Sequence, residues 1–143
     1  MVEIVNQQRK IKIKLEEFQD FAEKAVNSIE ESKGKELSIA FVSDARIKEL
    51  NNIFRNKNYP TDVLSFPYEP DQFDFLETEN FLGDIVISLE TAQRQATENS
   101  LSLDSEIKQL ILHGILHLCA YDHETDEGEM NEIELKLREK LKI

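Results

Sequence analysis

Short β-rich runs alternate with amphipathic segments in the first part of the chain, and three further amphipathic segments follow. Apolar spacings of three and four residues predict helices, and short apolar runs bounded by turn residues predict strands. This order of elements predicts a small mixed sheet with helices packed on it. The expected strands are Val2–Asn6, Leu37–Val42, Val63–Tyr68 and Ile85–Ser88. The expected helices are Leu15–Glu31, a segment through Ile47, Leu50 and Phe54 with its N-cap at Ser43 and Asp44, Leu89–Asn99, Asp104–Ala120 and Glu127–Leu141.

Nothing in the sequence divides this series into separate units. With 143 residues, no internal repeat and no long linker, the chain is expected to form one domain over residues 1–143. Pro67 places the third strand at an edge of the sheet or interrupts it, because proline has no N–H for a central ladder. The acidic stretch Glu69–Asn80, which carries Phe73 and Phe75, is expected to be a flexible loop or a lid.

Composition excludes several classes of protein. Hydrophobic residues make up 40% of the chain, which is too many for a disordered protein. Cys119 is the only cysteine, so a disulfide-stapled secreted scaffold is excluded. No apolar run approaches the ~20 residues that cross a bilayer. The first residues also lack the apolar run of a signal peptide. We therefore expect a cytoplasmic protein with no membrane partner.

The net charge of −12 is distributed unevenly along the chain. Residues 1–60 hold 11 Lys and Arg against 10 Asp and Glu, whereas residues 61–143 hold 6 against 19, so the balances are +1 and −13. Most of these charges are expected to form a solvated surface that aids solubility. Net charge does not exclude a local basic groove. Its candidates cluster in the first half: Arg9, Lys10, Lys12, Lys14, Arg46, Lys48, Arg55 and Lys57.

All three histidines lie in the eleven-residue segment HGILHLCAYDH. His113 and His117 are four residues apart on a predicted helix, so both imidazoles should leave the same face. His123 follows six residues later, where the chain has room to turn back toward that face. Three converging imidazoles leave one coordination position open for water, as in a catalytic zinc site. The alternative is an ordinary helix end with surface histidines, which would rarely have this spacing by chance.

The four-then-six spacing matches the long zincin pattern H-E-x-x-H-x-x-G-x-x-H, with two differences. Gly114 replaces the general-base glutamate and Ala120 replaces the glycine. A peptidase without that carboxylate loses its base, so a metalloprotease is disfavoured while the metal site stands. Cys119 should point to another side of the helix and is interpreted as a small core residue rather than a fourth ligand. Asp122 is either an acceptor that orients a ligand imidazole or an exposed loop residue.

The histidine segment resembles the YbeY family, together with LNNIFRNKNYPTDVLSFP at Leu50–Pro67 and LGDIVIS at Leu82–Ser88. The three blocks occur in the family's order, and the resemblance covers essentially the whole chain. The family motif reads H-G-x-L-H-L-x-G-Y-D-H. Ala120 departs from its usual glycine, which would cost on the order of 1 kcal/mol if the residue adopts a positive φ. The resemblance implies that one zinc ion per chain is held by His113, His117 and His123.

The resemblance also implies a fold, an activity and partners. The implied fold is α+β, with a four-stranded mixed sheet and the metal ligands on one helix and its following loop. The implied activity is zinc-dependent endoribonucleolytic cleavage of single-stranded RNA, with roles in maturing the 3′ end of small-subunit (16S) ribosomal RNA and in ribosome quality control. The implied partners are ribosomal RNA and the small ribosomal subunit, with a ribosome-associated GTPase as a further candidate.

Charge that builds up on phosphate oxygens needs a cation, and a guanidinium can bind two such oxygens at once. Arg55, at a predicted helix end, is the catalytic candidate, and the arginine of the YbeY family maps onto it. The alternative for Arg55 is a surface ion pair. Asp62, Ser65 and Asp84 are expected to line the same cleft, although either aspartate could instead cap a turn.

Three functions stay open at this point. The leading hypothesis is a metal-dependent endoribonuclease, favoured by an open metal position and by Arg55. The second is a ribosome-assembly binding protein whose zinc is structural or only weakly catalytic. The third is a metal-dependent hydrolase of a small phosphoester or amide.

Overall fold

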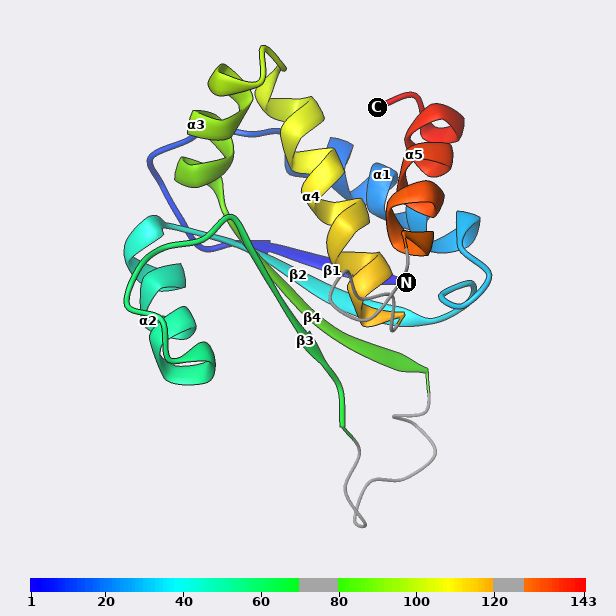
Figure 1. The fold of residues 1–143 in the computed structure, drawn as a ribbon, viewed down its shortest axis with the longest axis horizontal. Helices are drawn as coiled ribbons and strands as arrows, with labels where there is room; N and C mark the ends of the chain where they lie inside the picture. Colours follow the sequence, from blue (N-terminus) through cyan, green and yellow to red (C-terminus); the bar gives the residue numbers. More distant parts are fainter. Residues whose placement is uncertain (70–79, 120–127) are drawn as a thin grey trace.

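The computed structural model describes residues 1–69, 80–119 and 128–143. Its strands are β1 Val2–Asn6, β2 Glu36–Val42, β3 Val63–Pro67 and β4 Phe81–Ser88. They form one sheet in the order β1-β2-β4-β3 (Figure 1). β1, β2 and β4 are parallel, and β3 pairs with β4 in the antiparallel sense. β3 therefore lies at an edge, as Pro67 predicted.

Helices cover both faces of this sheet. They are α1 Leu15–Ser28, α2 Asp44–Arg55, α3 Leu89–Glu98, α4 Leu103–Leu118 and α5 Glu129–Leu141. α1, α4 and α5 gather on one face and α2 lies on the other, while α3 follows β4 directly and packs beside α4 (Figure 1). The predicted α+β class, with a four-stranded mixed sheet, is confirmed. None of the described helices combines the length and apolar composition that a bilayer span requires.

β4 contributes to two cores because successive residues of a strand face opposite sides. Ile85 and Ile87 are fully buried in the main core, which α1, α4 and α5 cover. Val86 belongs to a smaller core with Ile47 of α2 and Leu64 of β3. α2 and α4 thus lie on opposite faces, with β3 as the edge strand near both. This arrangement lets residues of α2 and α4 meet around the β3 edge.

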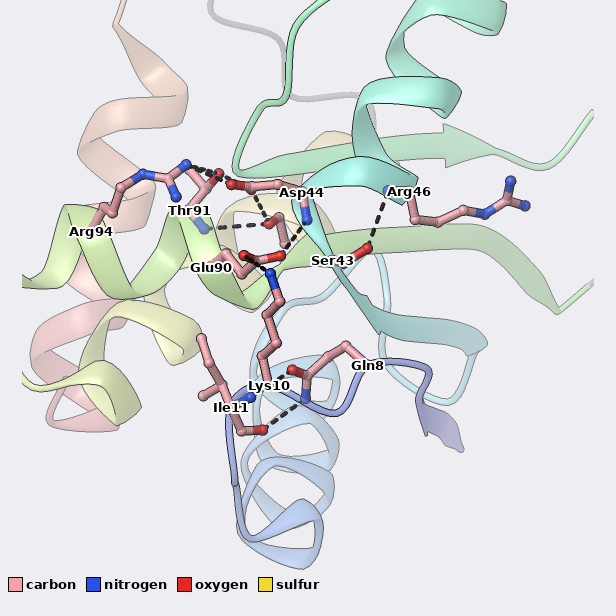
Figure 2. Close-up of polar contacts among 10 residues, drawn as sticks. Gln8, Lys10, Ile11, Ser43, Asp44, Arg46, Glu90, Thr91 and Arg94 are labelled. Carbon is pink, nitrogen blue, oxygen red and sulfur yellow. Dashed lines mark hydrogen bonds and ion pairs between the residues drawn. The ribbon is translucent and has the colours of Figure 1, made fainter.

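The N-terminal ends of α2 and α3 are joined through Asp44 (Figure 2). The Asp44 carboxylate accepts hydrogen bonds from Ser88 Oγ and Thr91 Oγ1, both at 2.6 Å, and pairs with Arg94 at 2.9 Å. The Asp44 N–H donates to Glu90 Oε1 at 3.0 Å. Burial alone would raise the pKa of Asp44, but these hydrogen bonds and the Arg94 charge outweigh burial and hold the pKa below its ordinary value.

The predicted element order is confirmed, and most boundaries shift by one to three residues. The largest difference is β4, which begins at Phe81 rather than at the predicted Ile85. Gly83 has φ 144°, and a Cβ there would collide with the carbonyl oxygen of Phe66. Glycine therefore lets the strand run through position 83, before the predicted start at Ile85. The predicted loop or lid falls mostly on residues 70–79, outside the described residues, and stays a prediction.

Candidate functional site

α4 brings two of the three histidines together. The helix begins after Ser102, whose hydroxyl accepts a hydrogen bond from the Ser105 N–H at 3.1 Å, and it continues to Leu118. His113 and His117 lie one turn apart, with their Nε2 atoms 3.0 Å from each other and their ring centroids 4.5 Å apart. The prediction that both imidazoles leave one face of the helix is confirmed.

Arg55 is the last residue of α2, and the left-handed Asn56, with φ 57°, ends the helix. The Arg55 guanidinium donates to the Ser65 carbonyl at 2.9 Å and lies 5.8 Å from the centre of the Phe66 ring. Within the described part of the chain, no carboxylate lies at ion-pair distance from Arg55. The structure therefore gives the surface ion-pair interpretation no support among these residues, and it anchors Arg55 on the edge strand instead.

The loop between α2 and β3 is folded back on the helix by the buried Asn51. The Asn51 Nδ2 donates to the Tyr59 carbonyl at 2.9 Å, and the Asn51 carbonyl accepts from the Lys57 N–H at 3.2 Å. At the other end of the loop, the Asp62 carboxylate accepts from the Val63 N–H at 2.7 Å. These bonds fix the loop backbone and therefore the position of the Lys57 Cα, from which its side chain extends.

α2, this loop, β3 and α4 enclose an open cleft of about 470 Å³, which we call the histidine cleft. Its cationic groups are Arg55 and Lys57, and its imidazoles are His113 and His117. Such a set of donors suits an anionic chain of phosphates. The lining residues are Asn51, Arg55, Lys57, Tyr59, Thr61, Asp62, Val63, Leu64, Ser65, His113 and His117.

Two of the three residues expected beside Arg55 line the histidine cleft, and one does not. Asp62 and Ser65 are in its lining. Asp84 pairs with Phe66 across the β3–β4 ladder and lines a separate hollow, where its carboxylate accepts a hydrogen bond from the Ser38 hydroxyl. The expectation for Asp84 is wrong because its position in β4 directs it to the face of the sheet that α2 covers.

α5 supplies a carboxylate that the sequence analysis did not single out. Glu134 Oε1 lies 2.7 Å from His113 Nδ1, and Glu134 Oε2 accepts from the Arg138 guanidinium at 3.1 Å. Met130 and Leu137, on the same side of α5, are buried. The sequence held one indication of this role: Glu134 lies on the apolar stripe of the last helix, where a charged residue is unusual unless it is paired.

A second hollow of about 560 Å³ lies on the α5 side of His113 and shares Asp62 with the histidine cleft. Its lining includes Glu106, which is 6% exposed and two helical turns before His113. Burial raises the pKa of the Glu106 carboxyl, Asp62 adds to the rise, and Arg138 opposes it. Sequence periodicity did not separate the buried Glu106 from the exposed Asp104 in the same helical turn.

Comparison with known proteins identifies the family. The family profile described as Endoribonuclease YbeY matches residues 3–142. The chain belongs to the YbeY endoribonuclease family. A relative named Endoribonuclease YbeY from Nautilia profundicola is 48% identical over 109 residues, which cover 76% of this chain and 74% of the relative. A relative of the same name from Syntrophomonas wolfei is 41% identical over 150 residues, covering 98% and 96%.

A solved structure has a similar fold. The solution structure of a protein from Thermotoga maritima superimposes with a TM-score of 0.67 at 31% sequence identity, covering 99% of this chain and 89% of that one. The family profile and the relatives confirm the resemblance to YbeY drawn from the histidine segment and the two further blocks. The third predicted ligand, His123, lies outside the described residues together with Ala120 and Asp122, so their roles stay predictions.

The two described imidazoles fit a zinc site. Ligand atoms 2.0–2.1 Å from a tetrahedral ion lie about 3.3 Å from each other. The separation of 3.0 Å between His113 Nε2 and His117 Nε2 is close to that value. Imidazole nitrogens are also common zinc donors. The geometry and the donor type are therefore both compatible with zinc.

Cys119, two residues after His117, behaves as a core residue. It is partly buried and packs against the main core. Burial raises the pKa of the Cys119 thiol to about 11, and Glu31 adds to the rise. A thiol this difficult to ionise is a poor metal ligand, because metals bind the thiolate. This supports the interpretation of Cys119 as a packing residue.

Proposed function

We propose that this chain is a zinc-dependent endoribonuclease that cleaves single-stranded RNA. The observation that carries the proposal is the histidine cleft, where two imidazoles of α4 share one open space with Arg55 and Lys57. Membership of a family of endoribonucleases supports the reaction class. The residues of the cleft come from α2, the loop after it, β3 and the distant α4, so the site forms only when α4 packs beside β3.

His113, His117 and His123 are the proposed ligands of one zinc ion per chain. The first two are supported by their converging Nε2 atoms and the third by the histidine spacing of the YbeY motif. When bound, zinc would lower the pKa of water toward neutrality and polarise a phosphoryl oxygen. Three protein ligands leave one coordination position for substrate or solvent, which is the arrangement of catalytic zinc.

Arg55 is proposed to bind the phosphate oxygens as negative charge builds up on them. Its contact with the Ser65 carbonyl uses one N–H, and a guanidinium has five, so donors remain for two phosphate oxygens. The Phe66 ring beside it limits its movement. Lys57 is proposed to bind a neighbouring phosphate as a point charge.

We further propose ribosomal RNA as the substrate, with roles in maturing the 3′ end of 16S ribosomal RNA and in ribosome quality control in the cytoplasm. The small ribosomal subunit and a ribosome-associated GTPase are the proposed partners. Support for these assignments is the agreement of three sequence blocks with the YbeY family.

The deciding experiment separates metal binding from cleavage. Purified full-length protein is analysed for zinc and then assayed for single-turnover cleavage of a single-stranded RNA, for the parent, Arg55→Ala and Arg55→Lys. We expect all three to retain zinc. Arg55→Ala should cleave about 10²–10³-fold more slowly, equivalent to about 2.7–4 kcal/mol of barrier. Arg55→Lys should recover part of the rate, because a point charge does not satisfy two oxygens at once.

Arg46→Ala is the matched control, because Arg46 lies on the same helix but forms an exposed ion pair with Glu49 at 3.0 Å. It should cleave like the parent. A zinc-loaded Arg55→Ala protein with parental cleavage would contradict the proposed role of Arg55. Zinc-loaded parent that binds the small subunit without cleaving RNA would support the ribosome-assembly binding protein instead, and cleavage of small phosphoesters alone would support the third hypothesis.

A further inference from the structure

Glu134 is a carboxylate on the buried side of α5. It is 5% exposed and lies between Met130, which is fully buried, and Leu137, which is 8% exposed. A carboxylate in such surroundings is unfavourable unless hydrogen bonds and charges compensate for its lost hydration. A charged residue on the buried apolar face departs from the usual pattern of an amphipathic helix. Such departures are concentrated at functional sites.

The partners of Glu134 show what compensates for its burial. Oε1 lies 2.7 Å from His113 Nδ1, and Oε2 accepts from Arg138 at 3.1 Å, one helical turn along α5. Each carboxylate oxygen thus has a polar partner, one on α4 and one on α5. α5 is held in place by its buried apolar residues, so the position of the carboxylate is fixed by the fold rather than by a flexible loop.

We propose that Glu134 is a positioning residue that holds the His113 ring with its proton on Nδ1 and its Nε2 lone pair directed into the histidine cleft. The Arg138 guanidinium beside Oε2 favours the charged carboxylate, which only accepts hydrogen bonds, so in the proposed arrangement Nδ1 is the donor. A neutral imidazole with a proton on Nδ1 has its lone pair on Nε2. That nitrogen is the one that lies 3.0 Å from His117 Nε2.

Arg138 supports this arrangement from the other side. Its bond to Oε2 leaves Oε1 for His113 and restrains rotation of the carboxylate. The two residues are four apart on α5, with Glu134 on the N-terminal side, which is the favourable order for such a pair. The expected effect on zinc affinity rests on the proposed function. The expected position of the His113 proton does not, because it concerns metal-free protein.

The test uses full-length protein and two readouts. The first is the ¹⁵N NMR signal of the His113 ring in metal-free protein at about pH 8, above the ordinary imidazole pKa of about 6.5. The second is zinc affinity from competition with a chelator at the same pH. Glu134→Ala should lose the preference for the Nδ1 proton and bind zinc about 10–100-fold more weakly. Glu134→Gln should be intermediate, because its amide oxygen still accepts a hydrogen bond.

Glu132→Gln is the matched control. Glu132 lies on the same helix and pairs with Lys136 four residues later at 3.5 Å, but both side chains are exposed. It should leave the His113 signal unchanged and zinc affinity within about twofold of the parent. If Glu134→Ala fails to fold, Glu134→Gln decides, because it keeps the shape of the side chain.

A folded Glu134→Gln protein with parental zinc affinity and a parental His113 signal would overturn the inference. Failure of the proposed function has a different signature. Parent protein that binds no zinc, or that binds zinc and cleaves no RNA, contradicts the proposed function, while the His113 signal in metal-free variants still decides the role of Glu134.

Discussion

Gly114, next to the first histidine, shows how packing restricts the chemistry of this site. A Cβ on Gly114 would lie 2.9 Å from both Cδ1 and Cγ2 of Ile85, a fully buried residue of β4. Position 114 therefore faces the sheet, whereas His113 faces the cleft. A general-base glutamate at this position would have to enter the main core, so the peptidase mechanism that the sequence disfavoured is also disfavoured by packing.

Gly114→Ala should destabilise the protein although alanine is the better helix former. The gain in helix propensity is about 1 kcal/mol. Overpacking a core typically costs about 1–3 kcal/mol, and two atoms of Ile85 have to move at once. We expect a net loss of about 1 kcal/mol, measured as a fall of about 2–4 °C in the thermal midpoint. The double variant with Ile85→Val should lose less than the sum of the single variants, and strict additivity would contradict this explanation.

At the residue scale, part of the candidate site was predictable from the sequence. The spacing of His113 and His117 predicted their convergence, because helical geometry alone determines which residues share a face. Glu134 was not predicted, since its contact with His113 depends on how α5 packs against α4. Asp84 was assigned wrongly because its side of the sheet depends on the register of β4.

At the element scale, the order of strands and helices followed from hydrophobic periodicity and turn residues. The strand order did not follow, because the pairing of β2 with β4 joins segments that are distant in sequence. The sequence also did not predict that α2 lies opposite α4. This placement allows Arg55 to reach the histidine cleft around β3. The Asp44 network at the start of α2 also depends on this three-dimensional arrangement.

Asp44→Asn should destabilise the protein at neutral pH. The substitution weakens the acceptor for the buried Ser88 hydroxyl and for Thr91, and removes the charge that pairs with Arg94. Loss of hydrogen bonds to a charged group typically costs about 1–3 kcal/mol. We expect a difference of that order in the free energy of unfolding, measured with denaturant at pH 7.

The difference in the free energy of unfolding between the parent and Asp44→Asn should shrink as the pH falls. Because the folded state lowers the pKa of Asp44 below the ordinary value of 3.8, its carboxylate stabilises the folded state above that pH. The contribution is lost as the pH falls from 3.8 through the lower pKa of the folded state. The parent and Asp44→Asn should therefore converge in acid. Asp104→Asn, at an exposed position in the first turn of α4, is the control and should show a much smaller difference at every pH. A pH-independent gap between Asp44→Asn and the parent would rule this mechanism out.

At the scale of the whole molecule, the net charge is negative, but cationic residues gather in the histidine cleft. The chain carries −12 overall, yet the histidine cleft includes Arg55 and Lys57. From the sequence, we predict RNA contacts from Lys57 and from one or more residues of the basic cluster Arg9, Lys10, Lys12 and Lys14. None of that cluster lines the histidine cleft. Lys10 instead pairs with Glu90 at 3.3 Å, beside the start of α2 (Figure 2).

Affinity for single-stranded RNA should therefore fall with salt and depend on Lys57 more than on Lys10. Each phosphate contact on a single strand contributes about −0.7 to the slope of log affinity against log salt, because counterions are released. Lys57→Gln should weaken binding and reduce the slope by about that amount, whereas Lys10→Gln should change neither. Binding is measured by fluorescence anisotropy from about 50 to 200 mM salt, with a chelator present so that the RNA stays intact. A flat salt dependence would show that the cleft does not bind phosphates. An equal loss in the Lys10 variant would instead place part of the RNA on the N-terminal basic cluster, at the other end of α2 from Arg55.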